Sequence, residues 1–156
     1  MERGVYRVAD APLESHEDLA LVALRRPETV VCLLSALRFH ELTTESPDSV
    51  WIAVENHSRP SRIEPLRLCV HYFSGPAFRE GVEEHLIAGV LVKIYSAAKT
   101  VADCFKFRNQ ISTQTALEAL REAWKKRTAT TEDLYRFARV CRVLNVMRPY
   151  LEGMLE

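Results

Sequence analysis

Residues 95–109 constrain the fold more than any other part of the chain, because they predict a strand that leads directly into a helix. An apolar, extended run ends at Tyr95, and Ser96 is a residue type that caps helix N-termini. The residues that follow recur at the i, i+3, i+4 spacing of one helix face: Ala97, Ala98, Val101, Cys104 and Phe105. The sequence therefore predicts a strand followed by an amphipathic helix.

Charged residues recur on a second face of this helix. Lys99, Asp103 and Lys106 have helical spacing, and Arg108 and Asn109 follow the last turn. A solvated helix satisfies such a row by i, i+4 pairing alone, at about 0.3–0.5 kcal/mol per pair. The alternative is that the row belongs to a binding surface. Both interpretations place these side chains on the outside of the protein.

Helical and strand-like patterns occur along the rest of the chain. Ser15 and Thr29 are candidate N-caps for helices over residues 16–26 and 29–39. Strand-like runs cover residues 50–54, 66–73, 83–87 and 90–95, with Ala88-Gly89 as the turn of a hairpin. Further helices are expected over 111–127, where Leu117, Leu120 and Trp124 share one face, after Thr130, and around Pro149. The prediction is one α+β domain with two N-terminal helices, a small mostly antiparallel sheet, and a C-terminal helical bundle packed on it.

The formal net charge of the 156 residues is zero, but the charge is unevenly distributed. Residues 1–92 contain nine Lys/Arg and fourteen Asp/Glu, whereas residues 93–148 contain twelve and five. Such asymmetry favours a polyanion or an acidic protein as the partner of the basic half. No apolar run is long enough to cross a membrane, and the four cysteines have the spacing of buried thiols rather than metal ligands. We therefore expect a cytoplasmic protein with no membrane contact.

No catalytic pattern is recognisable. The sequence has neither a Gly-rich phosphate loop nor a zinc-binding or nucleophile motif, and no two histidines have metal-ligand spacing. We expect no enzyme activity, no metal and no cofactor. Arg136, Arg139 and Arg142 follow each other at intervals of three, with Arg148 beyond them. They form either a solvated face or, with the helix described above, a basic surface for phosphates or carboxylates. The candidate binding residues are Lys99, Asp103, Lys106, Arg108, Arg139, Arg142 and Arg148.

The chain resembles the C-terminal domain of AbiEi-type antitoxins, the predicted transcriptional regulators of viral defence in type IV toxin–antitoxin systems. The resemblance runs almost end to end, in order, through residues 4–7 (GVYR), 32–37 (CLLSAL), 42–43 (LT), 50–53 (VWIA), 73–75 (FSG), 95–96 (YS), 99–106 (KTVADCFK), 116–120 (ALEAL) and 145–152 (NVMRPYLE). Family members usually begin with a winged helix-turn-helix domain, whereas this sequence starts at the segment that follows it. Residues 1–10 would then be the remnant of a linker or wing strand. Truncation and a natural short form both account for that start.

The resemblance implies two roles for full-length relatives. They repress their own operon through the winged helix, and they neutralise a nucleotidyltransferase-like toxin, with which they need not form a stable complex. Only neutralisation is expected of this chain, with operator DNA reached through the missing winged helix. One alternative is a DNA-backbone-binding or oligomerisation accessory domain. Another is a nucleic-acid-processing enzyme that uses Asp103 and Lys99.

Overall fold

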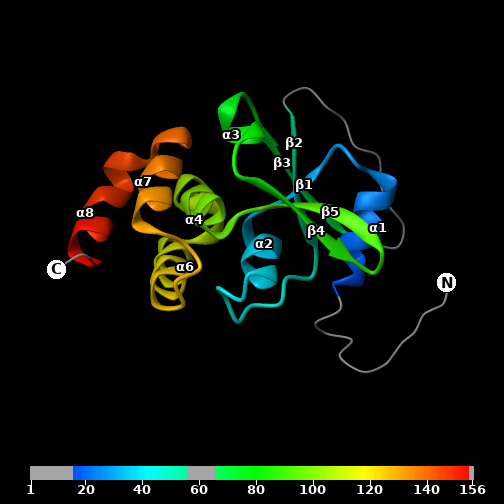
Figure 1. The fold of residues 1–156 in the computed structure, drawn as a ribbon, viewed down its shortest axis with the longest axis horizontal. Coiled ribbons are helices and arrows are strands. Elements are labelled where there is room, and N and C mark those ends of the chain that lie inside the picture. The colour runs from blue at the N-terminus through cyan, green and yellow to red at the C-terminus, as the bar shows by residue number, and fades with distance from the viewer. Residues whose placement is uncertain (1–15, 56–65, 155–156) are drawn as a thin grey trace.

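The computed structural model describes residues 16–55 and 66–154, which form a five-stranded mixed sheet and eight helices (Figure 1). The strand order is β3-β2-β1-β5-β4. The strands are β1 (Val30–Val31), β2 (Val50–Glu55), β3 (Leu68–Phe73), β4 (Val82–Ile87) and β5 (Val90–Tyr95). The pairs β1–β2 and β4–β5 are antiparallel, whereas β1–β5 and β2–β3 are parallel.

The helices both precede and follow the strands. They are α1 (Glu17–Arg25), α2 (Leu33–Phe39), α3 (Pro76–Arg79), α4 (Ala97–Lys106), α5 (Arg108–Ile111), α6 (Thr113–Lys125), α7 (Thr131–Val140) and α8 (Leu144–Met154). Figure 1 shows α1 beside the sheet, the helices α4, α6, α7 and α8 grouped at the other end of the molecule, and α2 between them.

The expected architecture is wrong in its arrangement, although the protein has the helices and strands of an α+β fold. The sheet is larger than predicted and mixed rather than mostly antiparallel. The two N-terminal helices do not follow each other, because β1 lies between them at the centre of the sheet. Val30 and Val31 were assigned to a helix capped at Thr29, but β-branched residues fit a strand well, and α2 begins only after Cys32.

Local signals for the hairpin and two caps are confirmed. Ala88 and Gly89 both have positive φ, the conformation that joins two twisted antiparallel strands, and Ile87 pairs with Val90 across the turn. The Ser96 hydroxyl accepts a hydrogen bond from the N–H of Lys99, and the Thr130 hydroxyl accepts one from Asp133. The predictions at residues 1–15, including the Ser15 cap and the linker remnant, lie outside the described residues, as do residues 56–65.

The two faces of the sheet contribute to two different cores. Alternation along a strand sends neighbouring residues to opposite faces, so Val31 and Ile94 join one core while Val30 and Tyr95 join the other. The first, the α1 core, consists of Leu19, Ala20, Val22, Val31, Ala36, Val50, Ile52, Val54, Ile87, Val92 and Ile94. The second, the α4 core, surrounds helix α4 and includes Phe73, Tyr95, Phe105, Leu120, Leu134, Phe137, Cys141 and Met147.

Candidate functional site

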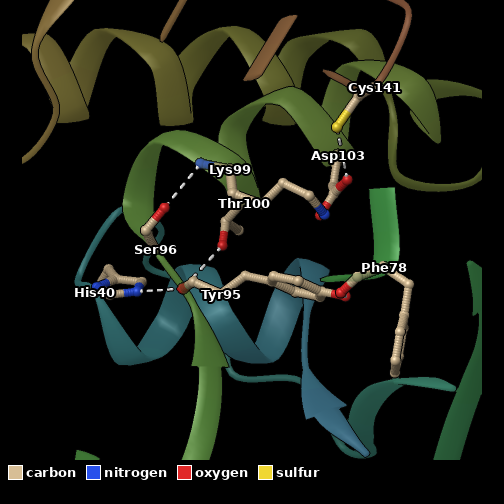
Figure 2. Close-up of polar contacts among 8 residues, drawn as sticks. All are labelled: His40, Phe78, Tyr95, Ser96, Lys99, Thr100, Asp103 and Cys141. Carbon is tan, nitrogen blue, oxygen red and sulfur yellow. Dashed lines mark hydrogen bonds and ion pairs between the residues drawn. The ribbon is translucent and has the colours of Figure 1, made fainter. Parts of the chain in front are cut away.

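Helix α4 is the centre of the α4 core and is buried on all sides. Every residue from Ala97 to Phe105 is buried, including the polar ones. The helix begins where β5 ends, with Ser96 capping its first turn and the Thr100 hydroxyl donating to the Tyr95 carbonyl at 3.4 Å (Figure 2). Helices α2, α6 and α7 pack around it. The amphipathic pattern therefore identified the helix but not its full burial.

Lys99 and Asp103 form an ion pair inside this core. The Lys99 Nζ lies 2.7 Å from Asp103 Oδ2, and both residues are 0% exposed. The same ammonium lies 3.7 Å from the centre of the Tyr95 ring and 4.8 Å from that of Phe73. Removing two ions from water costs several kcal/mol each, and a cation gains most from an aromatic face when it is desolvated. The carboxylate and the two rings together replace the water that the ammonium has lost.

The second carboxylate oxygen is also occupied. The Cys141 thiol donates to Asp103 Oδ1 at 3.2 Å, which joins the end of α7 to α4 (Figure 2). Burial raises the pKa of Asp103, while the Lys99 ammonium lowers it. Burial and the Asp103 carboxylate raise the pKa of Cys141, so this thiol stays protonated and serves as a donor. Asp103 thus contacts both a cation and a neutral donor.

Tyr95 connects the ion pair to the rest of the protein. Its hydroxyl donates to the Phe78 carbonyl of α3 at 2.7 Å, and its own carbonyl accepts from His40 Nε2 at 2.8 Å (Figure 2). Its ring stacks on Phe73, with 5.8 Å between the centroids. Burial raises the pKa of the Tyr95 hydroxyl, and the Asp103 carboxylate raises it further. One side chain therefore links α3, β3 and β5 below the Lys99 ammonium.

Gly81 allows the Lys99 side chain to approach the backbone. It has a φ of +82°, and a Cβ at this position would lie 2.7 Å from Lys99 Cβ and 3.0 Å from Phe137 Cε1. The close contact therefore excludes a larger residue, and the positive φ favours glycine independently. Sequence reasoning missed Gly81, Tyr95 and Cys141 as partners of the ion pair. The available signal was Lys-x-x-x-Asp inside an otherwise apolar segment.

The predicted surface residues separate into three groups. Lys99 and Asp103 are wrongly predicted as surface residues, since both are fully buried. Arg108 is half-buried and donates to the Phe105 carbonyl at 2.7 Å, where it helps to end α4. The remaining four are exposed, and within the described ranges none of them has an ion-pair partner: Lys106, Arg139, Arg142 and Arg148.

Two of the exposed cations lie near the same end of the helical group. Lys106 is close enough to Cys141 for its charge to lower the pKa of that thiol, and Arg142 is the next residue in the chain. The Arg142 N–H also bonds to the Arg139 carbonyl at 3.0 Å, at the end of α7. Lys106, Arg139 and Arg142 therefore sit around the ends of α4 and α7, while Arg148 is on α8.

The Lys99–Asp103 pair does not line the surface cleft at the end of α2. The surface cleft of about 590 Å³ between the end of α2 and α6 is lined by other charged residues, among them Arg38, Glu41, Glu118, Glu122 and Lys126. Among residues 16–55 and 66–154, no group of three or more His, Cys, Asp or Glu side chains is placed to hold a metal ion. The four cysteines are free, and Cys69 alone is half-buried rather than buried.

No protein-family model matches this sequence, and no curated protein matches it either. In the part of the chain that the structure describes, no helix is both long enough and apolar enough to cross a membrane. The interpretation of the site therefore depends on its own geometry.

Proposed function

We propose that this chain is a non-enzymatic antitoxin domain of the AbiEi type, which neutralises a nucleotidyltransferase-like toxin in the bacterial cytoplasm. The observation that carries the proposal is where the family-like segments fall. Residues 99–105 are all buried, and the segments at 32–37, 50–53 and 116–120 contribute most of their residues to the two cores. These four segments of the resemblance thus supply core residues, whereas most of the segment 145–152 is exposed.

The buried ion pair supports a binding role over an enzymatic one. An enzyme that used Asp103 and Lys99 would need both groups at a solvent-accessible cavity, where they contact substrate. Here each is fully enclosed and already occupied by the other. The residues available for recognition are instead the exposed ones, and the toxin would be recognised without covalent chemistry. Operator DNA would be read by a separate winged helix.

A DNA-backbone-binding or oligomerisation accessory domain is the second candidate. It is favoured by the exposed Lys106, Arg139, Arg142 and Arg148, which have no ion-pair partner among the described residues. Cations of this kind contact phosphates without reading sequence, and such binding weakens steeply as salt is added. This candidate therefore predicts DNA binding by the 156-residue chain that is weak, unselective and salt-dependent.

Growth rescue tests the proposal. The proposal requires a nucleotidyltransferase-like gene directly downstream, and the absence of such a gene would count against it. The chain is co-expressed with the product of that gene, and growth is compared with toxin alone. We expect the unaltered chain to restore growth, and a variant destabilised in the core, Asp103→Ala, to fail at a temperature where it unfolds. Lack of rescue by the unaltered, folded chain would contradict the proposal. In that case, salt-dependent binding to duplex DNA would favour the accessory role.

A further inference from the structure

Three histidines surround one phenylalanine at the end of α2. The Phe39 ring lies 5.2 Å from the rings of His16 and His40 and 4.7 Å from that of His85, measured between centroids. The rings of His40 and His85 are themselves 6.1 Å apart. His16 precedes α1, His40 follows α2, and His85 belongs to β4. The cluster therefore joins three elements that are distant in sequence.

His40 and His85, whose rings are 6.1 Å apart, each have a defined polar contact. His40 Nε2 donates to the Tyr95 carbonyl at 2.8 Å, and His85 Nε2 lies 2.9 Å from Glu83 Oε1. The titratable groups around Phe39 come from three elements: His16 from the start of α1, His40 from the end of α2, and Glu83 and His85 from β4. Next to His16 and His40 in the chain, or one residue further, are the charged residues Glu17, Arg38 and Glu41. From β5, the uncharged Tyr95 carbonyl contacts His40. Glu83 thus lies beside the two closely spaced imidazoles, and the charged residues of the cleft that His16 also lines lie around the end of α2: Arg38, Glu41, Glu118, Glu122 and Lys126.

We propose that His40 and His85 form an acid-sensitive latch, which fixes the end of α2 to the β4–β5 hairpin when the rings are neutral and releases it when both are protonated. Two cations at this separation repel each other, and the repulsion is strongest where solvent is partly excluded. Glu83 can compensate the charge on His85, but no second carboxylate contacts His40 within the described residues. The elements that the two rings hold together would then separate.

The expected direction of the pH effect follows from the environment of His40. Burial lowers the pKa of His40 from the ordinary 6.5, and the charge of His85 lowers it further, against the raising effects of the Tyr95 carbonyl and Glu83. The folded protein therefore binds fewer protons at this site than the unfolded chain. The stabilising contribution is complete above pH 6.5 and is lost as the pH falls through and below that value.

The latch is connected to the buried ion pair. The carbonyl that His40 holds belongs to Tyr95, whose ring lies against the Lys99 ammonium. Figure 2 shows His40 beside the backbone carbonyl of Tyr95 and the Lys99 side chain above its ring. Protonation near the surface would consequently loosen the junction between β5 and α4, while helix α8, which packs on α7 and α4 at the far end of the molecule (Figure 1), would keep its packing.

Hydrogen exchange of the whole chain tests the latch at about pH 7.5 and about pH 5.5, the range in which histidines change charge. Rates are corrected for the intrinsic effect of pH. We expect amides of α2 and β4 to lose protection severalfold at the lower pH, whereas those of α8 stay unchanged. In His40→Gln the side-chain amide can still donate to Tyr95 but takes up no proton, so the acid response should disappear. His85→Gln removes the opposing charge and should reduce it.

The matched control is His71→Gln, which removes a histidine from β3 at the opposite edge of the sheet and should preserve the acid response. An equal loss of protection in all variants, or a loss in α8 as large as that in α2, would overturn the latch. If His40→Gln does not fold, His85→Gln decides, because it leaves the bond from His40 to Tyr95 in place. A response in His85→Gln identical to that of the unaltered chain would then be the contradicting result.

Discussion

The two cores of this protein are built from different chemistry, although they share one sheet. The α1 core is aliphatic, and its described members include no ionisable side chain. The α4 core contains aromatic rings and thiols, and it encloses the Lys99–Asp103 ion pair. Burial of apolar area stabilises both cores, but this stabilisation does not depend on the orientation of the groups. The ion pair is stabilising only in one geometry, because each of its partners must be correctly placed.

The difference suggests that the two cores respond unequally to substitution. An aliphatic core tolerates changes of shape if its volume is maintained. A buried ion pair is often no more stabilising than apolar residues of equal size, yet breaking it is costly because one charge is left alone. We therefore expect the α4 core to fix the relative positions of α3, α4 and α7, and the α1 core to contribute mainly buried area.

The largest effect is expected from Asp103→Ala. This change leaves the Lys99 ammonium buried without a counter-ion and the Cys141 thiol without an acceptor. Removing one partner of a buried pair typically costs about 3–5 kcal/mol of unfolding free energy. Urea unfolding followed by circular dichroism measures the loss.

The double variant Lys99→Met/Asp103→Leu sharpens this test. It replaces both charges with apolar groups, so it should be more stable than Asp103→Ala, despite having one more substitution. If the double variant were the less stable of the two, the pair would contribute net stability and the interpretation of a placement role would be wrong.

A smaller loss is expected from Gly81→Ala, which adds a Cβ at 2.7 Å from that of Lys99. Overpacking typically costs about 1–3 kcal/mol, in addition to the strain of a positive φ. Gly89→Ala is the matched control: its φ is +79°, but nothing lies within 4 Å of the added Cβ. Thermal unfolding should therefore place Gly81→Ala below Gly89→Ala. Equal melting temperatures would show that the Lys99 contact adds no cost.

Some of this fold could be predicted from local sequence and some could not. The β4–β5 hairpin and the Ser96 and Thr130 caps depend on residues within a few positions of one another, and these predictions are confirmed. Strand β1 has two residues, too few for any periodicity, and only its pairing with β2 and β5 defines it. The β-branched Val30 and Val31 suit a strand, but the local sequence contains no sign of the long-range pairing that forms it.

The site was harder to predict for a related reason. Lys99 and Asp103 have the same i, i+4 spacing whether they are solvated or buried. What buries them is the approach of Gly81, of Tyr95 and of helices α2, α6 and α7, which the helix pattern does not contain. Trp124 shows the opposite error, since it shares a predicted apolar face with Leu120 but is 37% exposed. Trp124 lines a groove at the turn between α6 and α7, and this groove forms only when the two helices have packed.

A moderate effect is expected in the α1 core from Ile52→Val, which removes one buried methylene group from a residue that is fully enclosed. Changes of this type typically cost about 0.5–1.5 kcal/mol. Chemical denaturation should therefore give this variant a clearly higher unfolding free energy than Asp103→Ala. A loss as large as that of Asp103→Ala would remove the contrast between the two cores.

The smallest effect on stability is expected from reversing two exposed charges, Lys106→Glu and Arg142→Glu. Neither residue has an ion-pair partner among the described residues, and substitutions at such surface positions usually change the unfolding free energy by no more than about 0.5 kcal/mol. Across an interface, however, a like-charge contact can cost several kcal/mol. If these cations contact the toxin, the double variant should keep its melting temperature but lose growth rescue. Rescue equal to that of the unaltered chain would exclude them from the contact, and a large fall in melting temperature would mean that they stabilise the helical group instead.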